Sequence, residues 1–373
     1  MRIHVIGAGP AGLFFALLAR RRWPRWDIVV SEQNAADATF GFGVVFSQGA
    51  LAFLERDAPD FYRALTGRME IWPIQRIVHR DERVDVDGNG FASIARLRLN
   101  QFLQELCSEA GVRMIFGAPV TSLPEADLVV AADGVNSFVR NTLASEFRPD
   151  IEWLSNKFAW YGVEKPFDCL TLTFRQNRDG HFVAHHYRYS PTMSTFIVEC
   201  DAGTWRRAGL DRMDDAASCA YCADVFAPDL DGKPLVSNKS VWRSFPLLTN
   251  ANWRSGNVVL IGDALRTGHF SVGSGTRLAL EDAIALDKAL AVAGEDVQQA
   301  LERFEAQRRP VVEKIVAAAR QSSYWYERLA EKMQLPPWQL AYDYMTRSGR
   351  MDDARLASIA PAFMARRPMA AAR

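Results

Sequence analysis

The segment Gly7-Ala8-Gly9-Pro10-Ala11-Gly12 decides the fold of this 373-residue chain. The apolar run Ile3–Ile6 before it predicts a buried parallel strand, and Leu13–Ala19 after it predicts a helix. Ile28–Val30 predicts a second strand, and Glu32 follows at its end, about twenty residues past the last glycine of the segment. A strand, a glycine-rich turn, a helix, a second strand and an acidic residue in this order are typical of a dinucleotide-binding α/β domain.

The residues of the glycine segment have separate physical roles. Gly7 suits a tight turn, Gly9 has no Cβ to block a pyrophosphate, and Gly12 lets the helix pack closely on the strand. Pro10 and Ala11 stand next to the helix N-terminus, where free N–H groups and the helix dipole favour phosphate, so we include both in the expected site. The carboxylate of Glu32 is expected to accept hydrogen bonds from an adenosine ribose.

The composition is that of an ordinary globular protein. The chain is 49% hydrophobic and 24% charged, with 44 basic and 44 acidic residues and a formal net charge of +0. This balance does not indicate a nucleic-acid-binding or membrane-binding surface. The apolar stretch from Arg2 to Ala19 is similar to a signal peptide, but Arg20-Arg21-Arg22 follow it without a small-residue cleavage site. We therefore expect a cytoplasmic protein with no membrane span.

Five cysteines and six histidines indicate neither a disulfide framework nor a metal site. Cys219 and Cys222 form a C-x-x-C, but they lie in a predicted helix over 214–226 with no second pair. A packed helix face explains them better than a redox or zinc site. His185 and His186 are adjacent, so on a strand their side chains would point to opposite faces.

The remaining chain predicts an α/β core and a β-rich region. Asp127–Ala132 predicts another apolar strand, and 70–94 has β character. Three runs of period-two alternation predict an antiparallel meander, and they cover 170–174, 182–189 and 194–200. Helical patterns, followed by a helical tail through Arg347, cover 97–111, 275–293 and 297–320.

Three separated stretches resemble a known family, the class A flavoprotein aromatic monooxygenases with the para-hydroxybenzoate hydroxylase fold. The stretches are the glycine segment with Glu32, the run Ala131-Ala132-Asp133-Gly134-Val135-Asn136-Ser137 with Arg140, and Leu260-Ile261-Gly262-Asp263-Ala264. The resemblance implies FAD. It places Asp133 and Gly134 where the flavin and a pyridine nucleotide approach, and Gly262 and Asp263 at the ribityl and pyrophosphate part of FAD. Arg96 matches an arginine that contacts FAD.

A narrower resemblance is carried by Phe42-Gly43-Val44-Val45-Phe46-Ser47, by Thr192–Glu199 and by Arg266–Thr276. These stretches are similar to the subgroup of salicylyl-CoA 5-hydroxylase, 2-aminobenzoyl-CoA monooxygenase and the tryptophan hydroxylase of violacein biosynthesis. The subgroup implies cofactor contacts by Gly43 and Val44. The aminobenzoyl-CoA enzymes carry a second, reductase region, which this sequence up to Arg373 does not match, so we expect hydroxylation alone.

The family implies a Rossmann-like FAD-binding domain with an inserted antiparallel β-sheet substrate domain and a helical C-terminus. We expect the FAD-binding parts at 1–68, 95–152 and 253–293. The substrate domain is expected at 69–94 and 153–252, and the C-terminal helices at 294–373.

The resemblance implies hydroxylation of an electron-rich aromatic ring. Noncovalent FAD would be reduced by NADH or NADPH, and O2 would add to give a C4a-hydroperoxide that transfers one oxygen to the ring. Two other classes of protein are alternatives, a flavin halogenase and a non-catalytic binding protein. The pattern Trp-x-Trp-x-Ile-Pro of flavin halogenases differs from Ile71-Trp72-Pro73-Ile74, and a non-catalytic binding protein would have little need of both Asp133-Gly134 and Gly262-Asp263.

Further site residues follow from position. Gly273, Ser274, Gly275 and Thr276 precede a predicted helix, so their N–H groups are expected at the pyrimidine edge of the flavin. His269 is the candidate acid or base because it lies between Asp263 and this loop, and a structural histidine is the open alternative. Candidates for the substrate pocket, for which core packing is the alternative, are Phe42, Val45, His186 and Phe270.

The expected substrate is an aromatic acid thioester similar to salicylyl-CoA. A free aromatic, an indole or a carrier-tethered intermediate is the alternative. Arg76, Arg80 and Arg83 could bind the phosphates of coenzyme A, and a solvated edge strand explains them as well. We expect no nucleic-acid, metal or membrane partner, and either a monomer or a homodimer.

Overall fold

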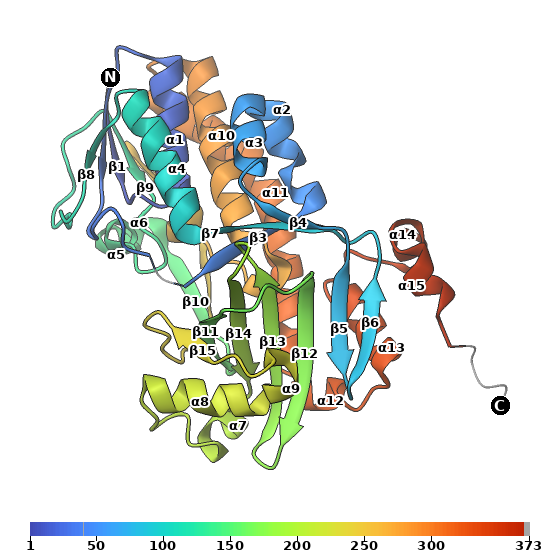
Figure 1. The fold of residues 1–373 in the computed structure, drawn as a ribbon. Coiled ribbons are helices and arrows are strands. Elements are labelled where there is room, and N and C mark those ends of the chain that lie inside the picture. Colours follow the sequence, from blue (N-terminus) through green and yellow to red (C-terminus); the bar gives the residue numbers. More distant parts are fainter. Residues whose placement is uncertain (40, 369–373) are drawn as a thin grey trace. The chain divides into compact units, whose positions relative to one another are not determined.

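The computed structural model describes residues 1–39 and 41–368 (Figure 1). Their contacts divide the chain into two compact units, each made of three separate segments. Unit 1 comprises 1–39, 97–152 and 246–317, and unit 2 comprises the described residues of 40–96, 153–245 and 318–373. The chain therefore alternates between the units four times before its final return to unit 2.

Unit 1 is built on a six-stranded sheet in the order β17-β18-β9-β1-β2-β8. Parallel pairs join β1 to β2 and β9, β2 to β8 and β9 to β18, while β17 pairs antiparallel with β18. The inner strands are short apolar runs with nearly every residue buried, as in parallel sheets covered on both faces. The bounds are β1 Arg2–Ile6, β2 Asp27–Ser31, β8 Arg113–Ile115, β9 Leu128–Ala131, β17 Arg254–Ser255 and β18 Val258–Leu260.

Helices α1, α4 and α10 run side by side next to this sheet (Figure 1). Arg22 near the end of α1 forms a bidentate ion pair with the buried Asp287 of α10, which fixes these two helices together. The helices and the remaining two-stranded sheet of unit 1 are α1 Pro10–Arg22, α4 Arg96–Glu109, α5 Phe138–Thr142, α6 Ala144–Phe147, α10 Gly275–Ala293, α11 Val297–Tyr326, β10 Pro149–Trp153 and β16 Pro246–Asn250.

Unit 2 is built on a seven-stranded sheet in the order β15-β11-β14-β13-β12-β5-β6. The predicted meander is confirmed, because β12, β13 and β14 pair antiparallel in sequence order. The bounds are β5 Gln75–His79, β6 Glu82–Val86, β11 Lys157–Val163, β12 Leu170–Asn177, β13 Gly180–Arg188, β14 Ser194–Cys200 and β15 Leu235–Ser237. A three-stranded sheet, β3-β7-β4, has the bounds β3 Gly43–Ser47, β4 Glu70–Trp72 and β7 Phe91–Ala95.

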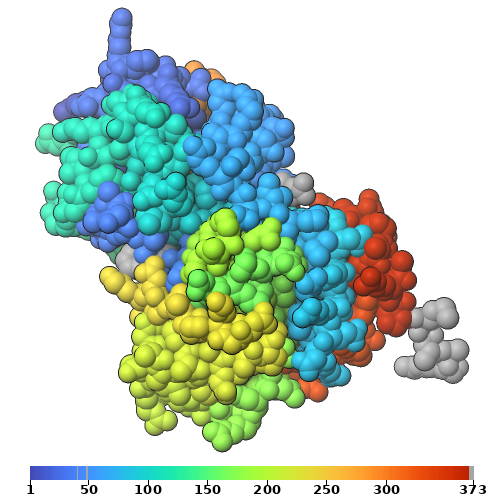
Figure 2. Space-filling view, in the orientation of Figure 1, coloured from blue at the N-terminus to red at the C-terminus, as the bar shows by residue number. Residues whose placement is uncertain are grey.

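Helices cover both faces of the seven-stranded sheet. One face packs on α7 Ala202–Arg207, α8 Asp215–Val225 and α9 Ala227–Leu230 through Ala184, Phe196 and Phe226. The other face packs, through Val183 and Phe174, on the end of α11 and on α12 Leu329–Lys332, α13 Pro337–Thr346, α14 Asp353–Ile359 and α15 Pro361–Ala365. Figure 2 shows the C-terminal segment, in red, beside the cyan β5–β6 hairpin. The short helices α2 Ala52–Asp57 and α3 Pro59–Thr66 follow β3.

The fold class expected from sequence is confirmed, with a parallel α/β unit, a largely antiparallel unit and a helical C-terminus. The predicted helix around Cys219 and Cys222 is also present as α8, and Cys222 is buried in the core of unit 2. The unit boundaries differ from the expected domain boundaries at three places. Residues 41–68 cluster with unit 2 because β3 pairs with β7. Residues 246–252 belong to unit 1 because β16 pairs with β10. The boundary between the units near the C-terminus falls within α11.

A buried carboxyl group lies in the core of unit 2. Glu199 on β14 is 1% exposed, and Oε1 accepts a hydrogen bond from Asn156 Nδ2 at 2.9 Å. Oε2 has no hydrogen-bond partner among the described residues. Burial, reinforced by the nearby carboxylate of Glu327, raises the pKa of Glu199 to about 8. The protonated form is therefore the one that the folded protein favours.

We predict that Glu199→Gln removes a pH-dependent loss of stability. The folded-state pKa lies above that of the unfolded chain, so wild-type stability should fall as pH rises from about 4.5 to about 8 and level off above it. The Gln variant keeps an acceptor for Asn156 and does not titrate. Its advantage should grow over this window to a few kcal/mol, at about 1.4 kcal/mol per pKa unit. Urea unfolding at pH 5 and pH 8.5 measures the difference, and identical pH profiles for the two proteins would contradict the prediction.

Candidate functional site

The predicted motifs of unit 1 lie at one edge of its parallel sheet. β1 ends at Ile6 and leads into the glycine segment, and β2 ends at Ser31 immediately before Glu32. β9 leads into Ala132 and Asp133, and β18 leads into Gly262 and Asp263. These four strands are neighbours in the order β18-β9-β1-β2. Open parallel sheets bind ligands at the carboxyl ends of their strands, so this edge is the candidate site.

At this edge, backbone segments approach one another so closely that two glycine positions have no room for a side chain. A Cβ on Gly7 would lie 2.3 Å from the carbonyl oxygen of Ala132, and a Cβ on Gly12 would lie 2.1 Å from the carbonyl oxygen of Gly7. Gly7 also has φ +104°, a conformation that side chains disfavour. The predicted roles of Gly7 in the tight turn and of Gly12 in close packing therefore agree with the geometry. Gly9 differs, because a Cβ there would meet no heavy atom within 4 Å.

Glu32 lies beside the glycine segment and bonds to backbone. Oε2 accepts the N–H of Ala8 at 2.9 Å, and Oε1 accepts the N–H and the side-chain amide of Asn34. Each carboxylate oxygen has lone pairs left for a further donor such as a ribose hydroxyl. The arrangement ties the acidic residue to the loop that precedes α1.

The Asp133–Gly134 loop contains a buried acceptor. Asp133 Oδ2 accepts the N–H of Val139 at 3.2 Å, while the buried Oδ1 has no hydrogen-bond partner among the residues described. Burial raises the pKa of Asp133, an effect that hydrogen bonds from Ser137 and Val139 oppose. Gly134 has φ +78° and open space where a Cβ would stand. A ligand donor can thus approach this loop closely.

Arg140 joins two of the predicted motifs. It is 2% exposed, and its guanidinium donates to the carbonyl oxygens of Val135 at 2.5 Å and Ala264 at 3.1 Å. Val135 belongs to the Asp133–Gly134 loop, and Ala264 belongs to the 3-10 turn η2 (Gly262–Ala264). One buried cation therefore fixes the distance between the loop and the turn.

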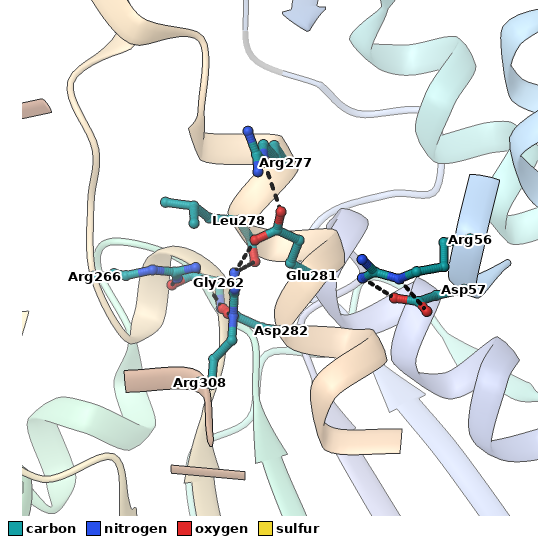
Figure 3. Close-up of polar contacts among 9 residues, drawn as sticks. All are labelled: Arg56, Asp57, Gly262, Arg266, Arg277, Leu278, Glu281, Asp282 and Arg308. Atoms are coloured by element: carbon teal, nitrogen blue, oxygen red, sulfur yellow. Dashed lines mark hydrogen bonds and ion pairs between the residues drawn. The ribbon is translucent and has the colours of Figure 1, made fainter. Parts of the chain in front are cut away.

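The Gly262–Ala264 turn is held by an ion-pair cluster that sequence reasoning missed (Figure 3). Asp282 of α10 accepts the N–H of Gly262 at 3.0 Å and forms ion pairs with Arg266 and Arg308. A signal was present in the sequence, since Asp282 interrupts the apolar stripe of α10 between Leu278 and Leu286. A charge in such a stripe requires a partner, but the partner cannot be identified from spacing alone.

The loop before α10 differs in part from the expectation, because the N–H of Gly273 donates to the carbonyl oxygen of Phe270 at 3.0 Å. Gly273 has φ +59°, and Ser274 is the N-cap residue of α10 without a side-chain capping bond. Ser274 Oγ is buried and has no hydrogen-bond partner within the described part of the chain. A Cβ on Gly275 would stand in open space, and Thr276 is half-buried in the first turn. The N-terminus of this 19-residue helix thus has room for a polar ligand.

His269 is 1% exposed and acts as a cap. Nδ1 lies 2.8 Å from Ser271 Oγ and accepts the N–H of Ser271 at 3.4 Å, which caps the 3-10 turn η3 (Phe270–Val272). Its ring lies 4.2 Å from that of the half-buried Phe270. These contacts suit the structural alternative.

The other predicted site residues lie in unit 2. Gly43 is clamped on both sides, since its N–H donates to Thr195 Oγ1 at 2.8 Å and its carbonyl accepts from Tyr187 Oη at 2.9 Å. Val44 is buried on β3. The ring of Phe42 lies against Gly162, where a Cβ would approach it to 2.5 Å.

Val45 and Arg96 have partners inside unit 2. Val45 packs on the cluster of Trp72, Leu170 and Tyr187. Arg96 begins α4, and its guanidinium lies 5.6 Å from the ring centre of Trp160. The expected contact of Arg96 with FAD stays a prediction.

His185 and His186 point to opposite faces of β13, as predicted. The His185 ring stacks on Tyr326, and the His186 ring stacks on Phe196. His186 is 2% exposed, its Nε2 lies 2.9 Å from Thr173 Oγ1, and burial holds its pKa well below the usual value. The packing alternative for His186 matches these contacts, and substrate contact stays a prediction.

The three arginines considered for coenzyme A differ in their surroundings. Arg76 forms a bidentate ion pair with Asp85, and Arg80 donates to the carbonyl oxygens of Met333 and Gln334. Arg83 is exposed on β6, an edge strand. The edge-strand explanation therefore fits Arg83, whereas Arg76 lies on the inner strand β5 and Arg80 lies in the turn between β5 and β6.

The residues at the sheet edge fit FAD. Ala11 and Gly12 present N–H groups of the first turn of α1 to a pyrophosphate, and Gly9 leaves space for it. Buried Asp133 Oδ1 and Ser274 Oγ have no hydrogen-bond partner among the residues that the structure describes, and a polar ligand would supply one. Across the described residues, no group of three or more His, Cys, Asp or Glu side chains is arranged for a metal, and no helix is long and apolar enough to cross a membrane.

Comparisons with known proteins agree with this site. The family model of the FAD binding domain matches residues 117–319, more than half of the chain. Salicyloyl-CoA 5-hydroxylase of Streptomyces sp is 42% identical over 93% of this chain and 70% of its own length. The 3-hydroxy-4-methyl-anthranilyl-(aryl-carrier protein) 5-monooxygenase of Streptosporangium sibiricum is 37% identical over 96% of this chain and 97% of its own.

A solved mutant structure of 2-methyl-3-hydroxypyridine-5-carboxylic acid oxygenase has the same fold, with a TM-score of 0.74 and 18% identity over 98% of both chains. The two sequence relatives are similar along nearly the whole chain, and the family model covers the Asp133 and Asp263 motifs. The chain belongs to the FAD binding domain family, and within it to the FAD-dependent aromatic monooxygenases.

Proposed function

We propose that this monooxygenase hydroxylates the electron-rich ring of an aromatic acid carried as a thioester, with NADH or NADPH as reductant. The observation that carries the proposal is similarity along nearly the whole chain to two enzymes named for such thioesters, salicyloyl-CoA and a carrier-bound anthranilyl group. A free aromatic acid or indole is the competing substrate class.

In the proposed site, different residues bind different parts of FAD. When bound, FAD supplies the activation of O2. The first turn of α1 binds the pyrophosphate, Glu32 the adenosine ribose, and Asp263 the ribityl and pyrophosphate part. The Gly273–Thr276 loop donates to the pyrimidine edge of a noncovalently held flavin.

Apolar side chains complete the proposed site by excluding water from the reacting atoms. Phe42, Val45 and Phe270 are the proposed lining, and each of them is half-buried. His269 is the proposed proton carrier. Arg96, Gly43 and Val44 are proposed FAD contacts.

We predict that the purified protein is yellow and uses salicylyl-CoA at least about tenfold better in kcat/KM than free salicylate. Contacts to the part of a substrate remote from the ring can be used to orient the reacting carbon, so the free acid should lose kcat as well as affinity. O2 uptake, hydroxylated product and hydrogen peroxide are measured together with NADH and with NADPH. Equal kcat/KM for acid and thioester would assign the enzyme to free aromatic substrates.

Replacing Asp263 by alanine should weaken FAD binding about tenfold or more. The substitution removes a hydrogen-bond acceptor for the cofactor, and hydrogen bonds to charged groups contribute about 1.5–3 kcal/mol. Fluorescence titration of the apoprotein with FAD gives the dissociation constant. Asp150→Ala, at another exposed position of unit 1, is the control and should leave it unchanged. A normal titration of the Asp263 variant would exclude the proposed contact.

Two substitutions of His269 separate proton transfer from capping. Asparagine retains an acceptor that can cap η3, whereas alanine does not. If His269 carries a proton, both variants should lose about a hundredfold of product formation while retaining FAD, with hydrogen peroxide released instead. Product and peroxide are measured in one assay across pH. Restoration of normal coupling by asparagine alone would limit His269 to its capping role.

A further inference from the structure

We propose that Asp282 is a positioning residue for the cofactor: its buried ion pairs with Arg266 and Arg308 hold the Gly262–Ala264 turn in the shape that presents Asp263 to FAD. The inference rests on the proposed function of this turn. It concerns residues of α10 and α11 that neither the sequence motifs nor the resemblance included in the site.

Both carboxylate oxygens of Asp282 are engaged without access to solvent (Figure 3). The residue is 0% exposed. Oδ2 accepts the N–H of Gly262 at 3.0 Å and lies 2.7 Å from Arg266 Nη2, and Oδ1 lies 2.9 Å from Arg308 Nε. Charge-assisted contacts of this kind are short and directional, so they hold the carboxylate in one orientation.

Asp282 and Arg266 bond to the two backbone polar groups of Gly262. Arg266 Nη1 donates to the Gly262 carbonyl at 2.7 Å, while Asp282 accepts its N–H. The glycine has φ +62°, and a Cβ on it would lie 3.0 Å from the Cβ of Ala11 in the first turn of α1. The ion pair between Arg266 and Asp282 thus fixes the conformation of Gly262 and its position against the N-terminus of α1. Asp263 is the next residue in the chain, so the backbone conformation of Gly262 sets the position from which its side chain projects.

The rest of the cluster anchors Asp282 itself. Arg308 of α11 also pairs with Glu281 at 2.6 Å, and Glu281 pairs with Arg277 at 2.8 Å. Three guanidinium groups thus face two carboxylates, which leaves one formal positive charge in excess. Helices α10 and α11 are both tied to the turn, so a shift of either helix would displace it.

A second ion pair on α10 makes no bond to the Gly262–Ala264 turn within the described residues. Asp287, five residues after Asp282, is buried and pairs with Arg22 of α1. Both pairs join elements of unit 1, and in each the aspartate is buried; Arg22 is 44% exposed, whereas Arg266 and Arg308 are buried. Asp282 contacts the backbone of the proposed FAD turn, whereas Asp287 accepts hydrogen bonds from Arg22 of α1. The two aspartates therefore separate a positioning role from a general contribution to stability.

Asparagine is the informative substitution at both positions because it preserves shape. In place of Asp282 it has one acceptor and one donor end, so it can accept from Gly262 or from Arg308 but faces the other donor with its own N–H groups. The Asn variant can therefore keep only one of the two contacts that Asp282 makes with Gly262 and Arg308. Loss of a carboxylate also adds positive charge near an anionic cofactor, and by charge alone this would tighten FAD binding.

The experiment compares Asp282→Asn with Asp287→Asn, each purified with FAD, converted to apoprotein and titrated with FAD. Thermal unfolding of both apoproteins is measured alongside. Both variants should unfold at lower temperature than wild type, but only Asp282→Asn should weaken FAD binding, by about tenfold or more. If Asp282→Asn does not fold, Arg266→Gln replaces it, since this variant removes the charged donor to the Gly262 carbonyl and leaves Asp282 paired with Arg308. The same loss of FAD affinity is expected.

Unchanged or tighter FAD binding by Asp282→Asn, with lowered thermal stability, would overturn the proposal and leave the cluster a role in the framework only. Equal weakening in Asp287→Asn would also overturn it. The titration needs no aromatic substrate, so failure of the thioester proposal does not affect it. If Asp263→Ala binds FAD normally while Asp282→Asn does not, the turn positions the cofactor through its backbone and the role of the Asp263 carboxylate is the part that fails.

Discussion

The close approach of backbone segments at the carboxyl ends of β1, β9 and β18 is the constraint on which unit 1 depends. The Gly7 carbonyl occupies the space where Gly12 would carry a Cβ, and the Ala132 carbonyl occupies that of Gly7. No side chain can lie between these segments, so the loops must meet through backbone atoms. The result is an edge lined by N–H groups and small residues, which is the surface that a dinucleotide requires.

Buried charged groups bond directly to the backbone of these loops. Arg140 bonds to carbonyl oxygens of two loops, and Arg266 with Asp282 holds both polar groups of Gly262. Directional bonds of this kind add little net stability compared with apolar contacts, but they distinguish one backbone conformation from its neighbours. Unit 2 uses uncharged groups for a similar purpose at Gly43, where Tyr187 and Thr195 bond to the two sides of one residue.

The sequence predicted the parts of the fold that depend on local pattern. The glycine segment, the apolar strands, the meander and helix α8 all follow from short-range rules, and the structure contains each of them. Partners far apart in sequence could not be predicted in this way. Asp282 is 26 residues from Arg308, and nothing in the spacing indicates that they meet. The unit assignment of 41–68 likewise depends on the pairing of β3 with β7. His269 shows the remaining limit, because its position in the sequence indicated the loop but not whether its ring caps a turn or transfers a proton.

The division of each unit into three segments has a consequence for how the protein forms. β1 and β9 are separated by more than a hundred residues, and β18 joins them only after 258 residues have been made. The sheet of unit 2 likewise lacks the cover on one face until α12 to α15 are present. Neither core can close while the first half of the chain leaves the ribosome, so the usual order, in which an N-terminal domain folds first, is not open to this protein. Its contacts are largely non-local, which makes the search for the native pairing slow. The apolar strands of both sheets therefore stay without their full set of partners until late in synthesis.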